Sequence, residues 1–227
     1  IDVNLLDLTE ASNLTCLGFA EEEGSFLAGA LAGLATLDKP KAKVGFIGGM
    51  DAPLIHRFQA GFAAGAAYAN PGLRKPGMIL SQYIGKDSSA FNDPGTASAI
   101  ATTMYKAGAG IIFAAAGGSG KGLLEAARAL GKDCIGVDTD QGYGYSSSED
   151  PKAKETGKHI LSSMLKRVDQ AVFLTSEELI KTGKVKGGYR TYDLKASGVG
   201  LALNSYNKDR LEPYMDRLDE LKARIMA

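Results

Sequence analysis

Short apolar segments alternate with helical segments along most of this 227-residue chain, and this alternation limits the fold more than any other feature. KVGFIGGM, MILSQYIG, GIIFAAA and CIGVDTDQ have the length and residue types of buried strands, and a similar segment at 13–19 precedes them. Helical patterns are expected at 21–35, 54–69, 94–107, 123–131, 153–172 and 209–226. A strand that regularly leads into a helix predicts right-handed crossovers and an α/β fold, with a parallel sheet flanked by helices.

The alternation stops near residue 185. KGGYRTYDLKASGVGLALNS is a polar and aromatic stretch that resembles a hairpin, with no helix inside it, and only the terminal helix follows. We therefore divide the chain into an entry segment at 1–20, an α/β lobe at 21–185 and a final segment at 186–227.

Charge and composition exclude several classes of protein. The 26 basic residues balance the 26 acidic ones, so the chain has no overall field that would attract nucleic acid. Cys16 and Cys134 lie far apart without metal-ligand spacing, so we expect two buried apolar residues and neither a metal nor a cofactor. No apolar stretch approaches the roughly 20 residues that span a bilayer. The opening IDVNLLDLTE has no leader pattern, and we expect further sequence upstream.

Ligands of open parallel sheets bind beyond the carboxyl ends of the strands. The loops at 48–51, 85–93, 117–122 and 138–142 follow predicted strands and should meet along one edge. We expect this edge to form a cleft wall of glycine backbone, Phe91, Lys121 and the carboxylates near residue 138.

The loop GGSGKG resembles a phosphate-binding turn, because glycines at a helix start expose backbone donors. It does not match a P-loop, since Ala115 replaces the first motif glycine and Gly122 replaces the hydroxyl residue that binds magnesium. It also lacks the third glycine of the dinucleotide fingerprint. A neutral ligand ring lying against the backbone explains the same glycines.

Asp138 and Asp140 end one predicted strand two residues apart. They could be paired catalytic carboxylates, ligands for a cation, or simply a helix cap and turn. Binding of vicinal sugar hydroxyls suits one of these carboxylates better, because such hydroxyls donate charge-assisted hydrogen bonds.

The remaining candidates are ambiguous from the residues alone. His56 and His159 lie in predicted helices without partners at ligand spacing, which favours structural or surface roles. Lys166 falls in the predicted helix SSMLKRVD, where a solvated lysine is the simplest interpretation. Phe91 could be a core residue or a stacking surface.

Several strings together resemble the basic membrane lipoprotein family of transporter substrate-binding proteins, whose best understood members recognise purine nucleosides. EEEGSFLAGALAG, VGFIGGMDAPLIHRFQAGFAAGA, YIGKDSSAFNDP, IIFAAAGGSGKGLLEAA, GVDTDQ, SSMLKRVDQAVF and YDLKASGVGL are similar to the family's segments and follow its order. The resemblance implies a fold like that of type I periplasmic binding proteins, with two α/β lobes that close on a nucleoside.

The resemblance also implies roles for individual residues. Phe91 matches the aromatic residue that stacks on the base, and Gly117 or Gly118 matches the glycine-loop contact. Asp138 matches the carboxylate that binds the ribose hydroxyls, with Asp140 as a possible substitute. Lys166 matches the family's cleft lysine.

The family's first lobe has no counterpart in this chain. We therefore expect 1–20 to enter from a hinge, 21–185 to form the C-terminal ligand-binding lobe, and 186–227 to return to an absent N-terminal lobe. The expected function is binding of inosine, guanosine or adenosine for uptake through an ABC transporter permease, by a periplasmic or lipid-anchored extracytoplasmic protein that is not an enzyme. Alternatives are a regulatory ligand-sensing domain and an enzyme acting on nucleosides or sugar phosphates.

Overall fold

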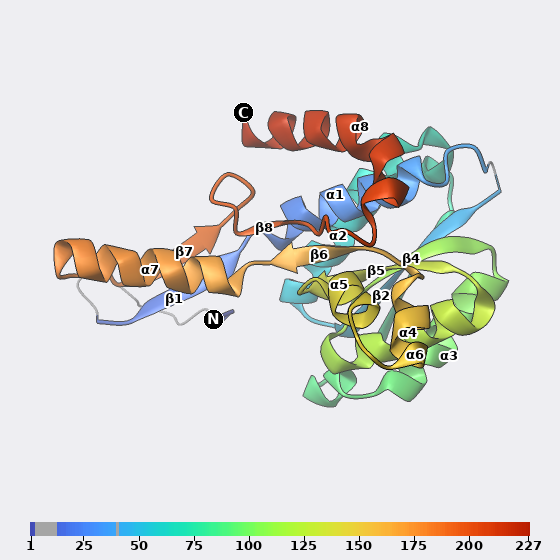
Figure 1. Cartoon of the computed structure of the whole chain (residues 1–227), viewed down its shortest axis with the longest axis horizontal. Helices are drawn as coiled ribbons and strands as arrows, with labels where there is room; N and C mark the ends of the chain where they lie inside the picture. Colours follow the sequence, from blue (N-terminus) through green and yellow to red (C-terminus); the bar gives the residue numbers. More distant parts are fainter. Residues whose placement is uncertain (3–12, 40) are drawn as a thin grey trace.

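The computed structural model, which describes residues 1–2, 13–39 and 41–227, contains a six-stranded sheet with helices on both faces (Figure 1). The strand order is β3-β2-β4-β5-β6-β8, and every pair is parallel except β6 with β8. The strands are β2 (Lys43–Met50), β3 (Ile79–Gly85), β4 (Ala109–Ala115), β5 (Asp133–Asp138), β6 (Ile160–Lys166) and β8 (Val199–Leu201). The α/β fold and its parallel sheet are confirmed.

Two apolar layers hold the sheet between its helices. Phe46, Phe62 and Phe113 form the centre of one layer, with ring centroids 5.5–6.2 Å apart. Ile112 and Leu123 belong to the other layer and are fully buried. The first layer lies under α1 (Glu21–Leu34) and α2 (Pro53–Ala69), and the second under α3 (Pro94–Lys106) and α4 (Gly120–Leu130). Shorter elements are η1 (Pro71–Arg74), η2 (Ser88–Phe91), η3 (Gly117–Ser119), α5 (Gln141–Ser146) and α6 (Pro151–Gly157).

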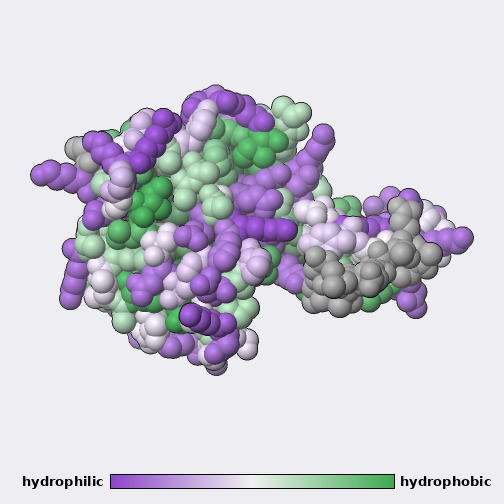
Figure 2. Space-filling model, turned by 180° about the vertical axis from the view of Figure 1, so that it is seen from behind, coloured by the Kyte–Doolittle hydropathy of each residue, from purple (hydrophilic) through white to green (hydrophobic). Residues whose placement is uncertain are grey.

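A small unit projects from this body, as Figures 1 and 2 show. It consists of the parallel pair β1 (Thr15–Phe19) and β7 (Gly188–Tyr192), with α7 (Val168–Thr182) beside them. Thr175 and Tyr192 share a hydrogen bond of 3.0 Å between their hydroxyl groups, which joins α7 to β7. The chain passes between the small unit and the body after β1, after β6 and between β7 and β8 (Figure 1).

The structure differs from the predicted division at residue 185. Helix α7 already lies with the small unit, whereas the terminal helix α8 (Lys208–Met226) packs on the body. Leu211, Leu218 and Leu221 of α8 are buried in the same apolar layer as Leu27 of α1. Residues 3–12 of the predicted entry segment lie outside the described residues.

The predicted helix at 153–172 is wrong, because a buried strand, β6, occupies its middle. The segment ILSSMLK has a single β-branched residue and carries two adjacent serines, which is unusual for a buried strand. Both serines are buried with their hydroxyl groups hydrogen-bonded: Ser162 donates to Ala202 O at 2.8 Å, and Ser163 Oγ accepts from Gln141 N at 3.1 Å. Partners elsewhere in the fold therefore permit a polar pair inside the sheet.

The predicted hairpin after residue 185 is also not formed. Strand β7 pairs with β1 in the small unit, and β8 pairs with β6 in the body. Cys16 and Cys134 are buried and free, as expected. Within the described residues, no helix is both long and apolar enough to cross a membrane, and no cluster of three or more His, Cys, Asp or Glu side chains could hold a metal.

Helices α1 and α2 pack closely because glycine residues lie at their interface. A Cβ at Gly65 would lie 1.9 Å from the carbonyl oxygen of Phe26. We expect Gly65→Ala to lower the free energy of unfolding by about 1–3 kcal/mol, because overpacking outweighs alanine's better helix propensity. Gly144→Ala is the control, since a Cβ there meets nothing within 4 Å. Urea unfolding of both variants measures the difference, and equal stabilities would contradict this description of the interface.

Candidate functional site

A pocket of about 200 Å³ opens where β4, β5 and β6 end. Its lining includes the predicted residues Phe91, Gly117, Asp138 and Lys166. In Figure 1 the arrow of β6 points toward the small unit, so this edge of the sheet faces that unit. Asp138 pairs with Leu165 in the β5–β6 register, which puts Asp138 and Lys166 at neighbouring strand ends. The rest of the wall is mostly apolar, from Leu54, Ile55, Phe58, Ala115, Ala116 and Val137, with Asp2 at the lysine side.

Asp138 has an unusual backbone conformation. Its φ is +67°, and the Thr139 amide donates to the Val137 carbonyl at 2.8 Å, which closes a tight turn around Asp138. Positive φ is uncommon for residues other than glycine and is enriched at functional sites. The carboxylate is exposed at the pocket and accepts no hydrogen bond from the described residues. It is therefore available to a ligand that donates hydrogen bonds.

Glycines allow the Phe91 ring to lie against the backbone. A Cβ at Gly49 would lie 2.5 Å from that ring, and one at Gly118 would lie 3.0 Å from the Phe91 carbonyl oxygen. Gly117 has a φ of +53°, and a Cβ there would contact Phe91 at 3.4 Å. The half-buried Phe91 ring and the exposed backbone of Gly117 consequently line the same pocket. This arrangement suits a flat ligand ring.

Lys166 is buried at the end of β6, not solvated as its predicted helix implied. Its ammonium group forms an ion pair with Asp2 and lies 3.2 Å from Oε1 of Glu21. It also lies 5.1 Å from the centroid of the Phe19 ring, in reach of a cation–π interaction. The lysine is thus fixed by carboxylates on one side and by an aromatic ring on another.

Burial raises the pKa of two carboxyl groups at this site. The pKa of Glu21 is raised because the fully buried side chain loses hydration, and the nearby Lys166 only partly opposes this. The pKa of Asp138 is raised for the same reason, although its side chain still reaches solvent, and Lys166 again acts in the opposite direction. The Asp138 carboxylate, which lines the pocket, would be stabilised by a ligand that donates hydrogen bonds to it.

Asp140 does not line this pocket. Its carboxylate caps α5 by accepting from the Tyr143 amide at 2.9 Å, and it also accepts from the Asn204 side chain at 2.9 Å. The structural interpretation of this residue as a helix cap is confirmed. Gly118 adjoins the pocket through Phe91 without lining it. Lys121 is exposed and also does not line it.

The two histidines lie outside the pocket. His56 contacts Asp51 at 2.6 Å, a partner five residues away in the sequence. His159 bonds the Lys132 carbonyl at 2.9 Å through Nδ1. Both have ordinary structural partners.

Sequence reasoning missed Glu21, which is 0% exposed. Three acidic residues at a helix start are already explained by a favourable interaction with the helix dipole. The one available signal was the position of Glu21 directly after the buried strand β1, which favours an inward-facing side chain.

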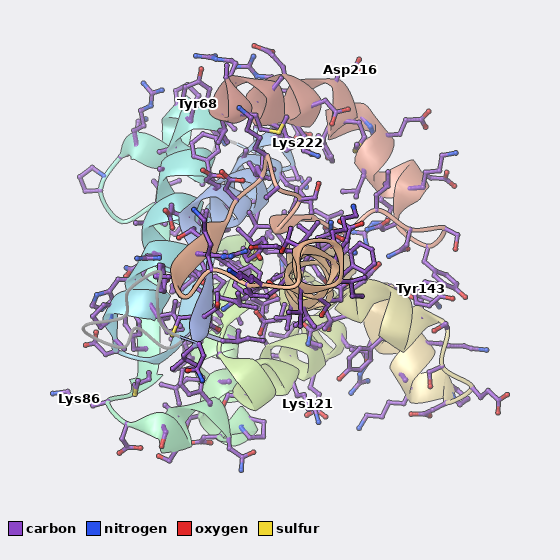
Figure 3. The ribbon with its side chains drawn as sticks, turned by 90° about the vertical axis from the view of Figure 1, so that its left-hand side faces the viewer. Tyr68, Lys86, Lys121, Tyr143, Asp216 and Lys222 are labelled. Carbon is purple, nitrogen blue, oxygen red and sulfur yellow. The ribbon has the colours of Figure 1, made fainter. Side chains whose placement is uncertain are left out.

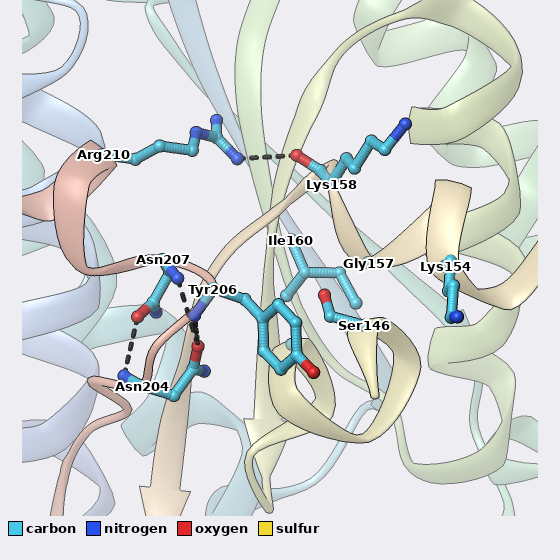
Figure 4. Close-up of a pocket in the computed structure, with 10 residues that line it drawn as sticks. Ser146, Lys154, Gly157, Lys158, Ile160, Asn204, Tyr206, Asn207 and Arg210 are labelled. Atoms are coloured by element: carbon cyan, nitrogen blue, oxygen red, sulfur yellow. Dashed lines mark hydrogen bonds between the residues drawn. The ribbon is translucent and has the colours of Figure 1, made fainter. Parts of the chain in front are cut away.

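A second cavity, of about 290 Å³, lies near Ile160 at the opposite end of β6 (Figure 4). Basic side chains surround it, but two of them already have partners. Arg210 donates to the Lys158 carbonyl at 2.7 Å and to Asp133 at 2.6 Å, and Lys158 pairs with Glu155 at 2.6 Å. None of the predicted site residues lines this cavity. Figure 3 shows the body from the side of the small unit, with Tyr143, near this cavity, and Lys86 on opposite sides of the molecule.

Comparison with known proteins confirms the family resemblance that the sequence segments indicated. Residues 6–225 match the sequence profile of the Bmp family, described as ABC transporter substrate-binding protein PnrA-like. "Basic membrane protein D" of Borreliella burgdorferi is 35% identical over 217 residues, which cover 94% of this chain and 57% of the relative. "ABC transporter nucleoside-binding protein BmpA" of Lactococcus lactis is 35% identical over 208 residues, covering 87% of this chain and 55% of the relative. The chain thus spans little more than half the length of these relatives.

The solved structures agree on the fold. A solute-binding protein of an ABC transporter system from Aeropyrum pernix K1 matches with a TM-score of 0.78 and 24% identity, over 99% of this chain and 67% of that one. This likeness supports the fold of type I periplasmic binding proteins.

The raised pKa of Asp138 predicts how stability depends on pH. The Asp138 carboxyl group binds its proton more tightly in the folded state than in the unfolded state. The protonated carboxyl group therefore favours folding at low pH, and this contribution to stability is lost as pH rises through the folded pKa. We expect Asp138→Asn to be more stable than the parent at neutral pH, with the difference vanishing below about pH 4. Thermal unfolding of both proteins across this range provides the measurement. A variant that is less stable at neutral pH would show that the carboxylate is stabilised in the folded state.

Proposed function

We propose that this chain, which belongs to the Bmp family of PnrA-like ABC transporter substrate-binding proteins, forms the C-terminal ligand-binding lobe of a purine nucleoside receptor. The observation that carries the proposal is the pocket at the carboxyl edge of the sheet, where Phe91, Gly117, Asp138 and Lys166 meet. The nucleoside-binding name of the Lactococcus lactis relative supports the choice of ligand.

The chemistry of the wall fits a nucleoside. Phe91 would stack on the base, with the backbone of Gly117 and Gly118 lying against its edge. The Asp138 carboxylate would accept hydrogen bonds from two ribose hydroxyl groups, which suits a pocket carboxylate that accepts no hydrogen bond from the described residues. Lys166 would donate to a ring or ribose oxygen at the far side of the pocket.

We place this protein among receptors, not enzymes. The histidines lie outside the pocket and have partners of their own, and the lysine there is held by carboxylates. A receptor needs only affinity and closure around its ligand, and the wall provides stacking and hydrogen-bonding groups for affinity. We therefore expect bound nucleoside to be released unchanged.

We further propose that β1, β7 and α7 are part of a second, N-terminal lobe that covers the pocket. On α7, apolar side chains are exposed to an extent that is unusual for a surface helix, with Phe173 at 60% and Ile180 at 83%. The pocket lies at the edge of the sheet that faces this small unit, and the chain matches little more than half of its relatives' length. A lobe at this position would exclude water from the second face of the ligand.

The family also suggests the setting of the whole protein. We propose an extracytoplasmic receptor, periplasmic or held at the cell membrane by a lipid, which delivers its nucleoside to an ABC transporter permease. Since the net charge is zero, no nucleic-acid partner is proposed.

The direct test is calorimetric titration of the protein with both lobes present, using inosine, guanosine, adenosine, cytidine and free ribose. We expect tight binding of purine nucleosides, weaker binding of cytidine and ribose, and no turnover detectable by chromatography. Absence of binding to any purine nucleoside would refute this proposal and leave the fold unaffected.

Asp138→Ala should weaken purine nucleoside binding by at least about a hundredfold, because hydrogen bonds from two hydroxyl groups to a charged acceptor are lost. Asp140→Ala is the matched control. It removes a helix cap, so we expect a loss of about 1 kcal/mol of stability and unchanged affinity. The opposite pattern in the two variants would assign the ribose contact to Asp140.

The second-lobe proposal predicts how α7 responds to substitution. In this chain alone, Ile180→Ser should change the free energy of unfolding by less than about 0.5 kcal/mol, because the side chain is 83% exposed. In the protein with both lobes, the same change should cost about 1–3 kcal/mol. Urea unfolding of the two forms makes the comparison, and an equal small effect in both would place the second lobe elsewhere.

A further inference from the structure

Glu21 is the most deeply buried ionisable side chain near the pocket that the proposed ligand contacts do not use. Its residue is 0% exposed, and its Oε1 lies 3.2 Å from the Lys166 ammonium without accepting a well-directed hydrogen bond from the described residues. Its other oxygen lies 3.5 Å from Arg57 of α2. A buried carboxylate is costly unless its partners compensate for lost hydration, so its position needs an explanation.

The place of Glu21 in the chain gives that explanation. It begins α1 directly after the chain leaves β1, where the small unit joins the body. Lys166 ends β6, directly before the chain returns to α7. The ion pair therefore connects the first two crossings between the small unit and the body.

The third crossing, between β7 and β8, is hydrogen-bonded to the start of the same helix, α1. Glu23 accepts a hydrogen bond from the Leu194 amide at 2.9 Å, and the Ala20 amide donates to the Tyr192 carbonyl at 3.0 Å. The Arg167 amide donates to the Gly198 carbonyl at 2.8 Å, which joins the second crossing to the third. All three crossings consequently meet at the start of α1, and Lys166 is the pocket residue that belongs to this junction.

We propose that Glu21 is a positioning residue, whose carboxylate holds the Lys166 ammonium against the pocket wall and links this ligand contact to the junction of the three crossings. The proposal rests on the nucleoside-binding function above and adds a residue that does not itself touch the ligand, since Glu21 does not line the pocket. Lys166 can donate three hydrogen bonds, and Asp2 and Glu21 orient the ammonium group on the protein side. Asp2 accepts one of these hydrogen bonds and Glu21 attracts the ammonium group from 3.2 Å, so a donor of Lys166 is left for the ligand.

The first test compares Glu21→Gln with Glu22→Gln, which makes the same charge change at an exposed position on the same helical turn. Calorimetric titration with inosine should show affinity about tenfold weaker for Glu21→Gln and unchanged for Glu22→Gln, because only the former loses a charged partner of Lys166. Thermal unfolding first establishes that each variant is folded. Glu21→Asp, which keeps the charge, should restore part of the affinity and replaces Glu21→Gln if that variant does not fold.

A second test does not depend on any ligand. Carboxyl-carbon NMR should show Glu21 titrating above the usual range for glutamate, with a midpoint that rises further in Lys166→Met, because the opposing positive charge is removed while Asp2 and Arg57 remain. If the parent binds no nucleoside, the proposed function fails and this titration alone decides the inference. A midpoint unaffected by Lys166→Met, or full inosine affinity in folded Glu21→Gln, would overturn it.

Discussion

Parallel pairing of β3, β2, β4, β5 and β6 is the constraint on which the rest of this structure depends. Because every one of these strands runs in the same direction, their carboxyl ends must meet along one edge. Residues that are far apart in the chain, such as Phe91 and Lys166, are brought together there without any direct sequence signal. The crossovers also place helices on both faces, so the loops at this edge are the region left free for a ligand.

The edge joins two kinds of chemistry that a nucleoside requires. Glycines at 49, 117 and 118 let backbone and the Phe91 ring approach closely, which forms a flat apolar surface. The neighbouring strand ends carry Asp138 and Lys166, which supply an acceptor and a donor. The buried carboxylate of Glu21 lies behind the lysine, where the small unit joins the body. The proposed ligand contact and the connection between the two units therefore share one lysine.

Much of this arrangement could be predicted from sequence. Alternating apolar and helical segments predicted β2 to β5 and the helices α1 to α4, and loop positions then placed Phe91, Gly117 and Asp138 at one edge. The sequence pattern around Lys166 did not predict strand β6. The two serines of this strand are buried because Gln141 and Ala202, which are distant in sequence, satisfy their hydrogen bonds. Likewise, the positive φ of Asp138 and the burial of Glu21 result from tertiary contacts. The family resemblance instead implied that Lys166 lies in the cleft, and Lys166 does line the pocket.

The central claim is that the ligand binds at the carboxyl edge, and amide NMR of the isotopically labelled protein during addition of inosine tests it most directly. Gly117 and Gly118 report on the proposed site, whereas Gly142 and Gly157 line the cavity at the opposite end of β6. We predict large shift changes at Gly117 and Gly118 with little change at the other pair. Changes confined to Gly142 and Gly157 would contradict the account and move the ligand to the other end of the sheet.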